Sequence, residues 1–169
     1  VMANTLRGVY GTDVLLATAN SFTGSVLQAD YTKKLAASMI MPNGLMSRQR
    51  SMTGAELKET VRAFVEGCEG GFVPFNRGSL PVVSGIAVEV KEAGGSYTLT
   101  GITRNGQPLR DDDTVTVTCL ATSKQMEALL ADKSGIPTDG DAWVKDTWRD
   151  YVSGGGAVLA EPENYMTLR

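Results

Sequence analysis

Two arginines separated by a single residue, Arg48 and Arg50, have the type and spacing best suited to hold an anion. Side chains two apart on a β-strand point to the same face, and here the arginines alternate with Ser47 and Gln49. Two guanidinium groups on one face could bind an anion such as a phosphate. The more common explanation is a solvated face of an edge strand, because charged side chains often protect exposed edges.

A second candidate is a polar loop that follows a buried strand. The run Asp13–Ala19 (DVLLATA) is continuously apolar, which is typical of a strand covered on both faces. Ligands of α/β proteins commonly bind at the carboxyl end of such a strand, although a plain surface turn fits equally well. The loop offers these candidate substrate contacts: Asn20, Ser21, Phe22 and Thr23.

Two aromatic residues lie in predicted loops and have more than one possible role. Phe22 is either a ring for ligand contact or, as we favour, a hydrophobic plug. Phe75 lies with Arg77 in a loop rich in Pro, Asn and Gly, Phe72–Leu80, where it could contact a ring or a partner. The alternative for Phe75 is packing of this loop onto the core.

Composition makes several classes of function improbable. The sequence has no histidine, which excludes histidine-based triads and removes the commonest metal ligand. Net charge is −3 and no basic block is present, so we expect no nucleic-acid partner. No run is long and apolar enough to span a membrane. Cys68 and Cys119 cannot form a zinc site alone, and their pairing stays open. Asp111–Asp113 predicts a solvated hairpin loop rather than a metal site.

One helix is predicted with particular clarity. Thr53 and Glu56 fit a capping box, in which a threonine caps the helix and a glutamate three residues later bonds back. An apolar stripe follows at helical spacing, and it consists of Leu57, Val61, Phe64, Val65 and Cys68. We expect this helix, Thr53–Gly67, to pack on the strand Asp13–Ala19.

The remaining pattern predicts an α+β fold with a mixed β-sheet and packed helices. Helices are expected at Val1–Val9, Tyr31–Met39, Ser123–Ala131 and Asp141–Val152, the last with Trp148 inward and Trp143 half-exposed or at a domain contact. Lys133–Gly140 is expected as a loop. Strands are expected at Leu45–Met52 (half-buried or at an edge), Val82–Val90 (with Gly85 at a bulge or close approach), Ser96–Ile102, Val115–Leu120 and Tyr165–Leu168.

Four segments, taken in order, carry a resemblance to a known family. VMANTLRGVYGTDVLLATANS resembles its opening helix, first strand and the start of its substrate loop. Pro42, with Gly54 twelve residues later in TGAEL, matches its "PF-x-N … TG-x-EL" spacing. VSGI resembles a "VSG-hydrophobic" strand, and DTWRDYV with GGGAVLAEPENYMTLR resembles its closing helix and strand. The family is that of the 5′-nucleotidases and UDP-sugar hydrolases, and nearly the whole chain resembles its C-terminal domain.

The resemblance implies a single domain over residues 1–169, cut from a larger protein. Its partner would be an N-terminal metallophosphoesterase domain of the same protein, which would hold divalent metals and do the hydrolysis. This chain would hold no metal or other cofactor, and alone it would not hydrolyse phosphate esters. By the same resemblance, the parent would be a bacterial type of protein that is extracellular, periplasmic or attached to the cell surface.

The sequence also departs from the family pattern. The family loop "NSGGIR" ends in an arginine, whereas this chain has Asn20 and Ser21 followed by Phe22 and Thr23. The two aromatic rings that hold a base in the family have no counterpart near Leu80 or Leu120–Thr122. The implied function is therefore a substrate-recognition domain with an atypical or degenerate nucleotide pocket. The alternative is a non-catalytic binding or scaffolding module, and a free-standing ligand binder is a third, weaker possibility.

Overall fold

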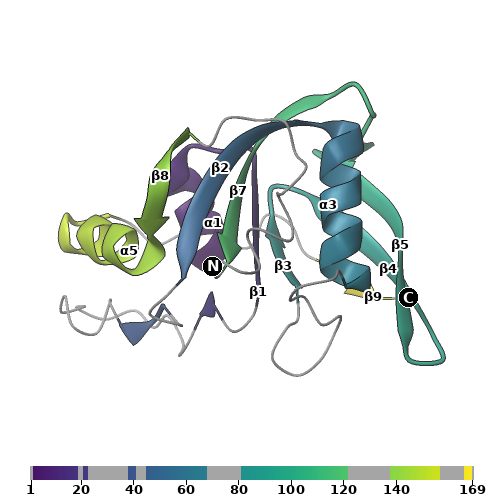
Figure 1. The fold of residues 1–169 in the computed structure, drawn as a ribbon, viewed down its shortest axis with the longest axis horizontal. Helices are drawn as coiled ribbons and strands as arrows, with labels where there is room; N and C mark the ends of the chain where they lie inside the picture. Colours follow the sequence, from purple (N-terminus) through teal and green to yellow (C-terminus); the bar gives the residue numbers. More distant parts are fainter. Residues whose placement is uncertain are drawn as a thin grey trace.

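The computed structural model describes residues 2–18, 21–22, 38–40, 45–67, 81–121, 138–156 and 166–168, with only the backbone at 138–142 and 166–168. Its strands form two sheets, with strand orders β3-β1-β7-β2-β8 and β6-β5-β4-β9. The first sheet consists of β1 (Val14–Thr18), β2 (Met46–Thr53), β3 (Pro81–Ser84), β7 (Thr114–Ala121) and β8 (Thr138–Trp143). The second consists of β4 (Ala87–Ala93), β5 (Ser96–Arg104), β6 (Gln107–Pro108) and β9 (Met166–Leu168). The described helices are α1 (Met2–Tyr10), α3 (Gly54–Glu66) and α5 (Val144–Ser153) (Figure 1).

The first sheet is mixed, which confirms the predicted fold class. β1 runs parallel to β7, whereas β3 is antiparallel to β1 and β2 is antiparallel to β7. β1 therefore lies inside the sheet, as its continuous apolar run predicted. A second sheet was not predicted as a separate layer.

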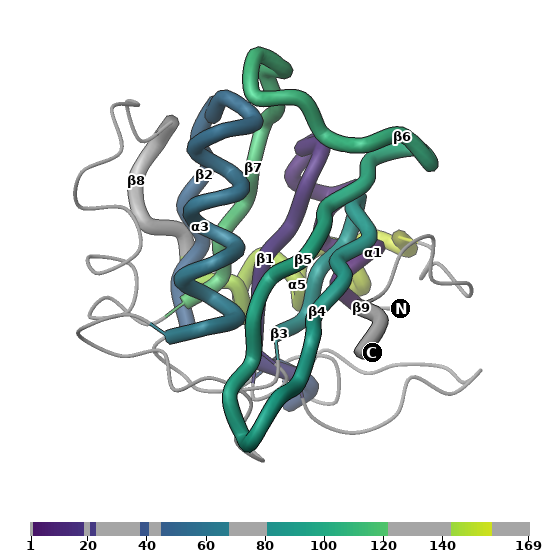
Figure 2. Tube along the Cα trace, turned by 90° about the vertical axis from the view of Figure 1, so that its right-hand side faces the viewer, coloured from purple at the N-terminus to yellow at the C-terminus, as the bar shows by residue number. Residues whose placement is uncertain are grey.

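Each face of the first sheet carries its own hydrophobic cluster. α1 and α5 cover one face, where Leu15 and Leu120 meet Leu6 of α1 and Trp148 of α5. α3 and the second sheet cover the other face (Figure 2). Neighbouring side chains on β1 alternate between the clusters, so Leu16 belongs to the second one. The sheet is thus buried on both sides, as a central layer must be.

Helix α3 has the predicted cap and the predicted apolar face. Thr53 Oγ1 accepts a hydrogen bond from the Glu56 amide, and Glu56 Oε2 accepts one from the Thr53 amide at 2.7 Å. The four described stripe residues are buried in one cluster with Val14 and Leu16 of β1: Leu57, Val61, Phe64 and Val65. Burial of this face, more than helix propensity, stabilises a helix of this length.

The predicted strand Val82–Val90 is in fact two strands in different sheets. β3 ends at Ser84, the chain bends at Gly85 and Ile86, and β4 begins at Ala87. Gly85 is a close-approach point as predicted, with φ of 86°. The apolar pattern of residues 82–90 indicates burial, but it does not show that the chain passes from one sheet to the other within this segment.

The predicted strand Ser96–Ile102 is present as β5, and it forms a hairpin with β4. β4 and β5 pair antiparallel through the turn at Gly94 and Gly95. Asn105 and Gly106 both have positive φ, as the tight turn from β5 to β6 requires. The predicted final strand is present as β9, which lies parallel to β4.

The start of the last helix was predicted wrongly. Residues 138–143 form β8, which pairs with β2, so α5 begins only at Val144. Part of the predicted loop Lys133–Gly140 is therefore strand. Trp143 precedes the helix and is 50% exposed, whereas Trp148 is buried, as predicted. The predicted loop Phe72–Leu80, the helix Ser123–Ala131 and nearly all of the helix Tyr31–Met39 lie outside the described residues.

Candidate functional site

The strand ends that border most of the segments proposed for substrate contact meet at one edge of the first sheet. The carboxyl ends of the parallel strands β1 and β7 lie there, at Thr18 and Ala121. β2 and β3 run the opposite way, so their first residues, Met46 and Pro81, lie at the same edge. The carboxyl ends of neighbouring parallel strands are where open α/β sheets usually bind ligands.

Arg48 and Arg50 lie on one face of β2, as their alternation predicted. They share that face with Met52, which belongs to the cluster beneath α3. Arg48 lies opposite Cys119 and Arg50 lies opposite Val117 on the neighbouring strand β7. The arginines therefore point toward the α3 side of the sheet, and Arg48 is the nearer of the two to the edge at which β1 and β7 end.

The expectation that this is a solvated edge-strand face is wrong. β2 lies between β7 and β8, so it is an inner strand, although it is half-buried as predicted. Arg50 is only 9% exposed and Arg48 is partly buried. Charged side chains are rarely this buried unless they have a partner, so these two arginines differ from ordinary surface charges.

The positive charges of these two arginines favour the binding of an anion beside them. Burial lowers the pKa of Arg50, and the positive charge of Arg48 lowers it further. The Arg50 guanidinium nevertheless stays protonated near neutral pH. The two arginines make further interactions within the protein, so part of their charge already has a partner.

Cys119 lies opposite Arg48 on β7 and belongs to the core cluster beneath α3. Its thiol is free and fully buried, and burial raises its pKa to about 12 although Arg50 and Arg48 oppose the rise. The thiol therefore behaves as a small hydrophobe rather than a nucleophile.

The loop after β1 sends its described aromatic residue to the opposite face. Ser21 is buried and its hydroxyl lies 3.3 Å from that of Thr18. Phe22 forms an isolated bridge with Ile40 and packs against the cluster between the sheet and helices α1 and α5. The structure thus brings Ser21 and Phe22 together, but it places Phe22 and the arginines on different faces.

The other proposed contacts, Asn20, Thr23 and Phe75, lie outside the described residues. Within the described ranges, no group of three His, Cys, Asp or Glu side chains could hold a metal ion. No helix among these same residues is long and apolar enough to cross a membrane. Asp111–Asp113 is an exposed turn, as predicted, but it links β6 to β7 in the other sheet instead of closing a hairpin.

The structure also has a groove between α3 and the second sheet, which the sequence did not predict. Lys58 and Arg62 line it from the helix, and β5 lines it from the second sheet. Both residues lie outside the apolar stripe that the sequence shows on this helix. Their spacing of four residues was a possible signal, but the sequence could not show that β5 lies opposite.

Comparison with known proteins identifies the fold. No protein-family model and no curated protein matches the chain. Among solved structures, a 5′-nucleotidase precursor from Thermus thermophilus is 16% identical with a TM-score of 0.70, and the match covers 99% of this chain and 35% of that one. The NAD nucleotidase of Haemophilus influenzae is 15% identical with a TM-score of 0.66, covering 99% and 32%. A sulfate thiohydrolase from Thermus thermophilus is 12% identical with a TM-score of 0.61, covering 96% and 30%.

The chain spans about a third of the length of each of these proteins. Their identity to it is low, so what they share with it is the fold. The fold implied by the resemblance in the sequence is confirmed, because the Thermus nucleotidase superimposes on almost the whole chain. The chain therefore has the α+β fold of the C-terminal domain of 5′-nucleotidases.

Proposed function

We propose that this chain is the substrate-recognition domain of a 5′-nucleotidase-like phosphoester hydrolase. The observation that carries the proposal is the match of 99% of the chain to about a third of a 5′-nucleotidase precursor. In this proposal the rest of the parent protein includes an N-terminal metallophosphoesterase domain. That domain would hold the divalent metals and activate the attacking water.

The substrate site would lie at the carboxyl ends of β1 and β7, with Arg48 as its anion contact. Arg48 occupies the third position of β2, close to the edge at which that strand begins. Arg50 lies deeper on the same face, and its positive charge adds to the potential at Arg48. A phosphate bound beside Arg48 would offset the repulsion that the two guanidinium groups exert on one another.

We expect this site to bind ordinary nucleotides weakly. In the family that the sequence resembles, a base is held between two rings, and stacking of this kind contributes about 1–3 kcal/mol per base. Here Leu120 and Ala121, at the end of β7, are buried in the core. Phe22 packs on the far face of the sheet, which supports its role as a plug.

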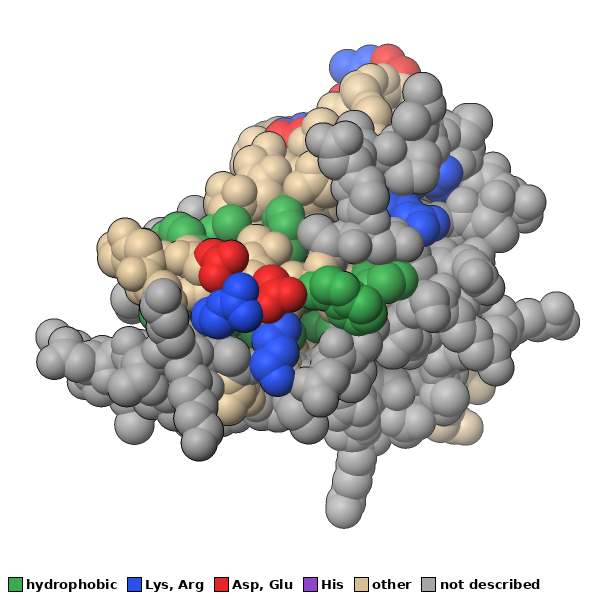
Figure 3. All heavy atoms as spheres, turned by 60° about the vertical axis from the view of Figure 1, so that its left-hand side comes forward, with side chains coloured by type: hydrophobic (Ala, Val, Ile, Leu, Met, Phe, Trp, Pro, Cys, Tyr) green, Lys and Arg blue, Asp and Glu red, His purple; other side chains and the backbone are tan. Residues whose placement is uncertain are grey.

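A scaffolding role is the second candidate, and one surface favours it. Trp143 is half-exposed at the start of α5, where Arg149 forms ion pairs with Asp146 and Asp150. On the side that carries this helix, charges of both signs lie next to hydrophobic side chains (Figure 3). Such a mixed surface suits contact with an attached domain. The sulfate thiohydrolase also has this fold, so the fold alone does not fix the substrate.

Calorimetric titration of the chain with AMP, adenosine and UDP-glucose would test the proposal. We expect dissociation constants no tighter than about 1 mM, with AMP bound more tightly than adenosine because only AMP offers a phosphate. Arg48→Ala should weaken AMP binding several-fold. Arg110→Ala is the matched control, because Arg110 lies in an exposed turn at the opposite edge and forms an ion pair with its neighbour Asp112.

The outcomes separate the candidates. Equal affinity of wild type and Arg48→Ala for AMP, or no binding of any nucleotide, would favour the scaffolding role. Micromolar binding of AMP that depends on Arg48 would overturn the degenerate pocket and make this arginine a full phosphate clamp. A location outside the cytoplasm is part of the same proposal, because the matched Thermus protein is a 5′-nucleotidase precursor.

A further inference from the structure

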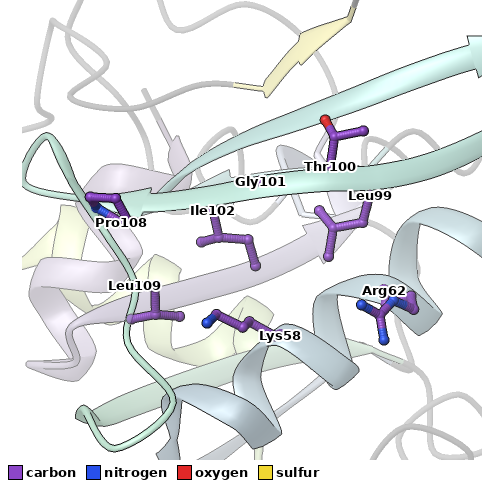
Figure 4. A pocket seen from close by; sticks show the side chains of 8 residues that line it. All are labelled: Lys58, Arg62, Leu99, Thr100, Gly101, Ile102, Pro108 and Leu109. Carbon is purple, nitrogen blue, oxygen red and sulfur yellow. The ribbon is translucent and has the colours of Figure 1, made fainter.

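A groove of about 320 Å³ opens between α3 and the second sheet. Figure 4 shows Leu99, Ile102 and Leu109 pointing into the space between the strand and the helix, while Thr100 points away from it. Lys58 and Arg62 project from successive turns of α3 along the same space. The groove is lined by Lys58, Arg62, Leu99, Thr100, Gly101, Ile102, Pro108 and Leu109.

The groove has an apolar floor, and two basic side chains lie along it. Ile102 and Leu109 are nearly fully buried and form a firm apolar floor. Among the eight residues that line it, two are basic and none is acidic. A concave apolar floor with a few convergent polar groups is the usual composition of a small-molecule site.

Arg62 is the side chain best placed to hold a ligand. Its Nε lies 4.0 Å from Glu66 Oε1, which is too far for a hydrogen bond. That same oxygen accepts a hydrogen bond from the Leu99 amide at 3.0 Å, so the glutamate is held by the strand edge. The Arg62 side chain is 58% exposed, and its guanidinium can present two parallel N–H groups to a carboxylate.

Lys58 gives the groove a second positive charge and also limits the charge of a suitable ligand. Its Nζ donates to Asp111 Oδ1 at 2.7 Å. The carboxylates of Asp111 and Glu66 thus lie close to the two cations. A phosphate with two negative charges would be repelled by both carboxylates, whereas a single carboxylate needs only the fork of Arg62.

We propose that this groove binds a small organic monocarboxylate with an apolar body, its carboxylate on Arg62 and its body on Ile102 and Leu109. The site is separate from the proposed substrate edge. α3 begins at the opposite edge of the first sheet, where the Gly54 and Ala55 amides donate to the Asp113 and Asp111 carbonyls. The inference therefore does not depend on the proposed function.

Phenylacetate is a suitable probe, because it combines one carboxylate with one apolar ring. We would titrate it into the ¹⁵N-labelled chain and follow the amide signals. The account predicts saturable shifts at Leu99, Gly101 and Ile102. The matched probes are 2-phenylethanol, which has the ring without the charge, and acetate, which has the charge without the ring. Both should bind at least about tenfold more weakly than phenylacetate.

Variants identify the group that holds the carboxylate. Arg62→Gln should weaken phenylacetate binding about tenfold, because it removes a charge-assisted pair of hydrogen bonds. Lys91→Gln removes a positive charge from an exposed position on β4 and should leave binding unchanged. The proposal is overturned by any of three results: no saturable shifts at these amides, equal binding of 2-phenylethanol, or unchanged affinity in Arg62→Gln. Tighter binding of inorganic phosphate than of phenylacetate at the same amides would also contradict it.

Discussion

Gly85 lies against the backbone carbonyl of Asp13, so close that a β-carbon at position 85 would stand 1.9 Å from the oxygen. This contact joins the start of β1 to the bend at which the chain leaves the first sheet for the second. Two requirements therefore coincide at Gly85, a positive φ of 86° and room for a neighbouring backbone. Glycine alone meets both without strain.

Gly85→Ala should be strongly destabilising. The variant adds the strain of a positive φ to a backbone clash, and together these should cost about 3 kcal/mol or more of unfolding free energy. Gly106→Ala is the matched control, because Gly106 has a φ of 75° but nothing within 4 Å of its β-carbon position. It should cost only about 1 kcal/mol. Urea denaturation of both variants measures the difference, and equal losses would refute the close approach.

The Asp13 carboxyl should make the free energy of unfolding depend on pH in the acid range. Partial burial works to raise the pKa of this carboxyl, but hydrogen bonds from the Thr116 amide and hydroxyl and the charge of Arg104 outweigh it, so the pKa is lowered from 3.8. The carboxylate form is thus favoured by folding. Its contribution is fully present above about pH 4 and is lost as the pH falls through the lowered pKa.

Asp13→Asn tests this contribution. At pH 7 the variant should be less stable by about 1–2 kcal/mol, a figure reduced because the Asp13 side chain is 35% exposed. The difference from wild type should shrink as the pH is lowered toward about 2. Asp112→Asn, in the exposed turn, is the matched control. A constant deficit of Asp13→Asn at every pH would argue against the lowered pKa.

Phe64 anchors α3 in the core between the two sheets. It is 2% exposed, so Phe64→Ala should cost about 3–5 kcal/mol of unfolding free energy. Glu59→Ala, on the exposed face of the same helix, should change stability by less than about 0.5 kcal/mol. Chemical denaturation of the two variants gives both values. A loss below about 1 kcal/mol for Phe64→Ala would mean that α3 does not pack as described.

Elements whose signals are local were predictable from the sequence. The capping box of Thr53 and Glu56 and the tight turn at Asn105 and Gly106 each depend on a few adjacent residues, and both are present in the structure. The end of α5 is a similar case, because the helix expected to end at Val152 ends at Ser153, next to Gly154. Residues 138–143, by contrast, become strand β8 because β2 offers a free side for pairing, and only the folded sheet supplies that partner.

In the candidate site, too, local features could be predicted from the sequence and long-range packing could not. Alternation correctly predicted that Arg48 and Arg50 share a face, because strand geometry fixes this locally. It could not show that β8 would pair with the outer side of β2, or that α3 would lie on the same face of the sheet as the arginines. Phe22, which was expected as a ligand contact or, as favoured, a hydrophobic plug, packs on the other face of the sheet.

Cys119 should resist alkylation in the folded protein. Burial raises its pKa to about 12, so almost no thiolate is present near neutral pH and the sulfur is shielded from reagent. We expect iodoacetamide to modify it only as fast as the chain unfolds. Cys68→Ser would make the readout specific, and mass spectrometry would follow it with and without urea. Rapid modification without denaturant would contradict the burial of this thiol.

The most direct test of the central claim is the position at which a nucleotide phosphate contacts the chain. We would titrate AMP to tens of millimolar into ¹⁵N-labelled protein and record amide shifts for wild type and Arg48→Ala. The account predicts that shifts gather at the carboxyl ends of β1 and β7 and the start of β2, at Thr18, Ser21, Ala121 and Arg48, and largely vanish in Arg48→Ala. Shifts that gather elsewhere, or that persist unchanged in the variant, would contradict a substrate-recognition role for this edge.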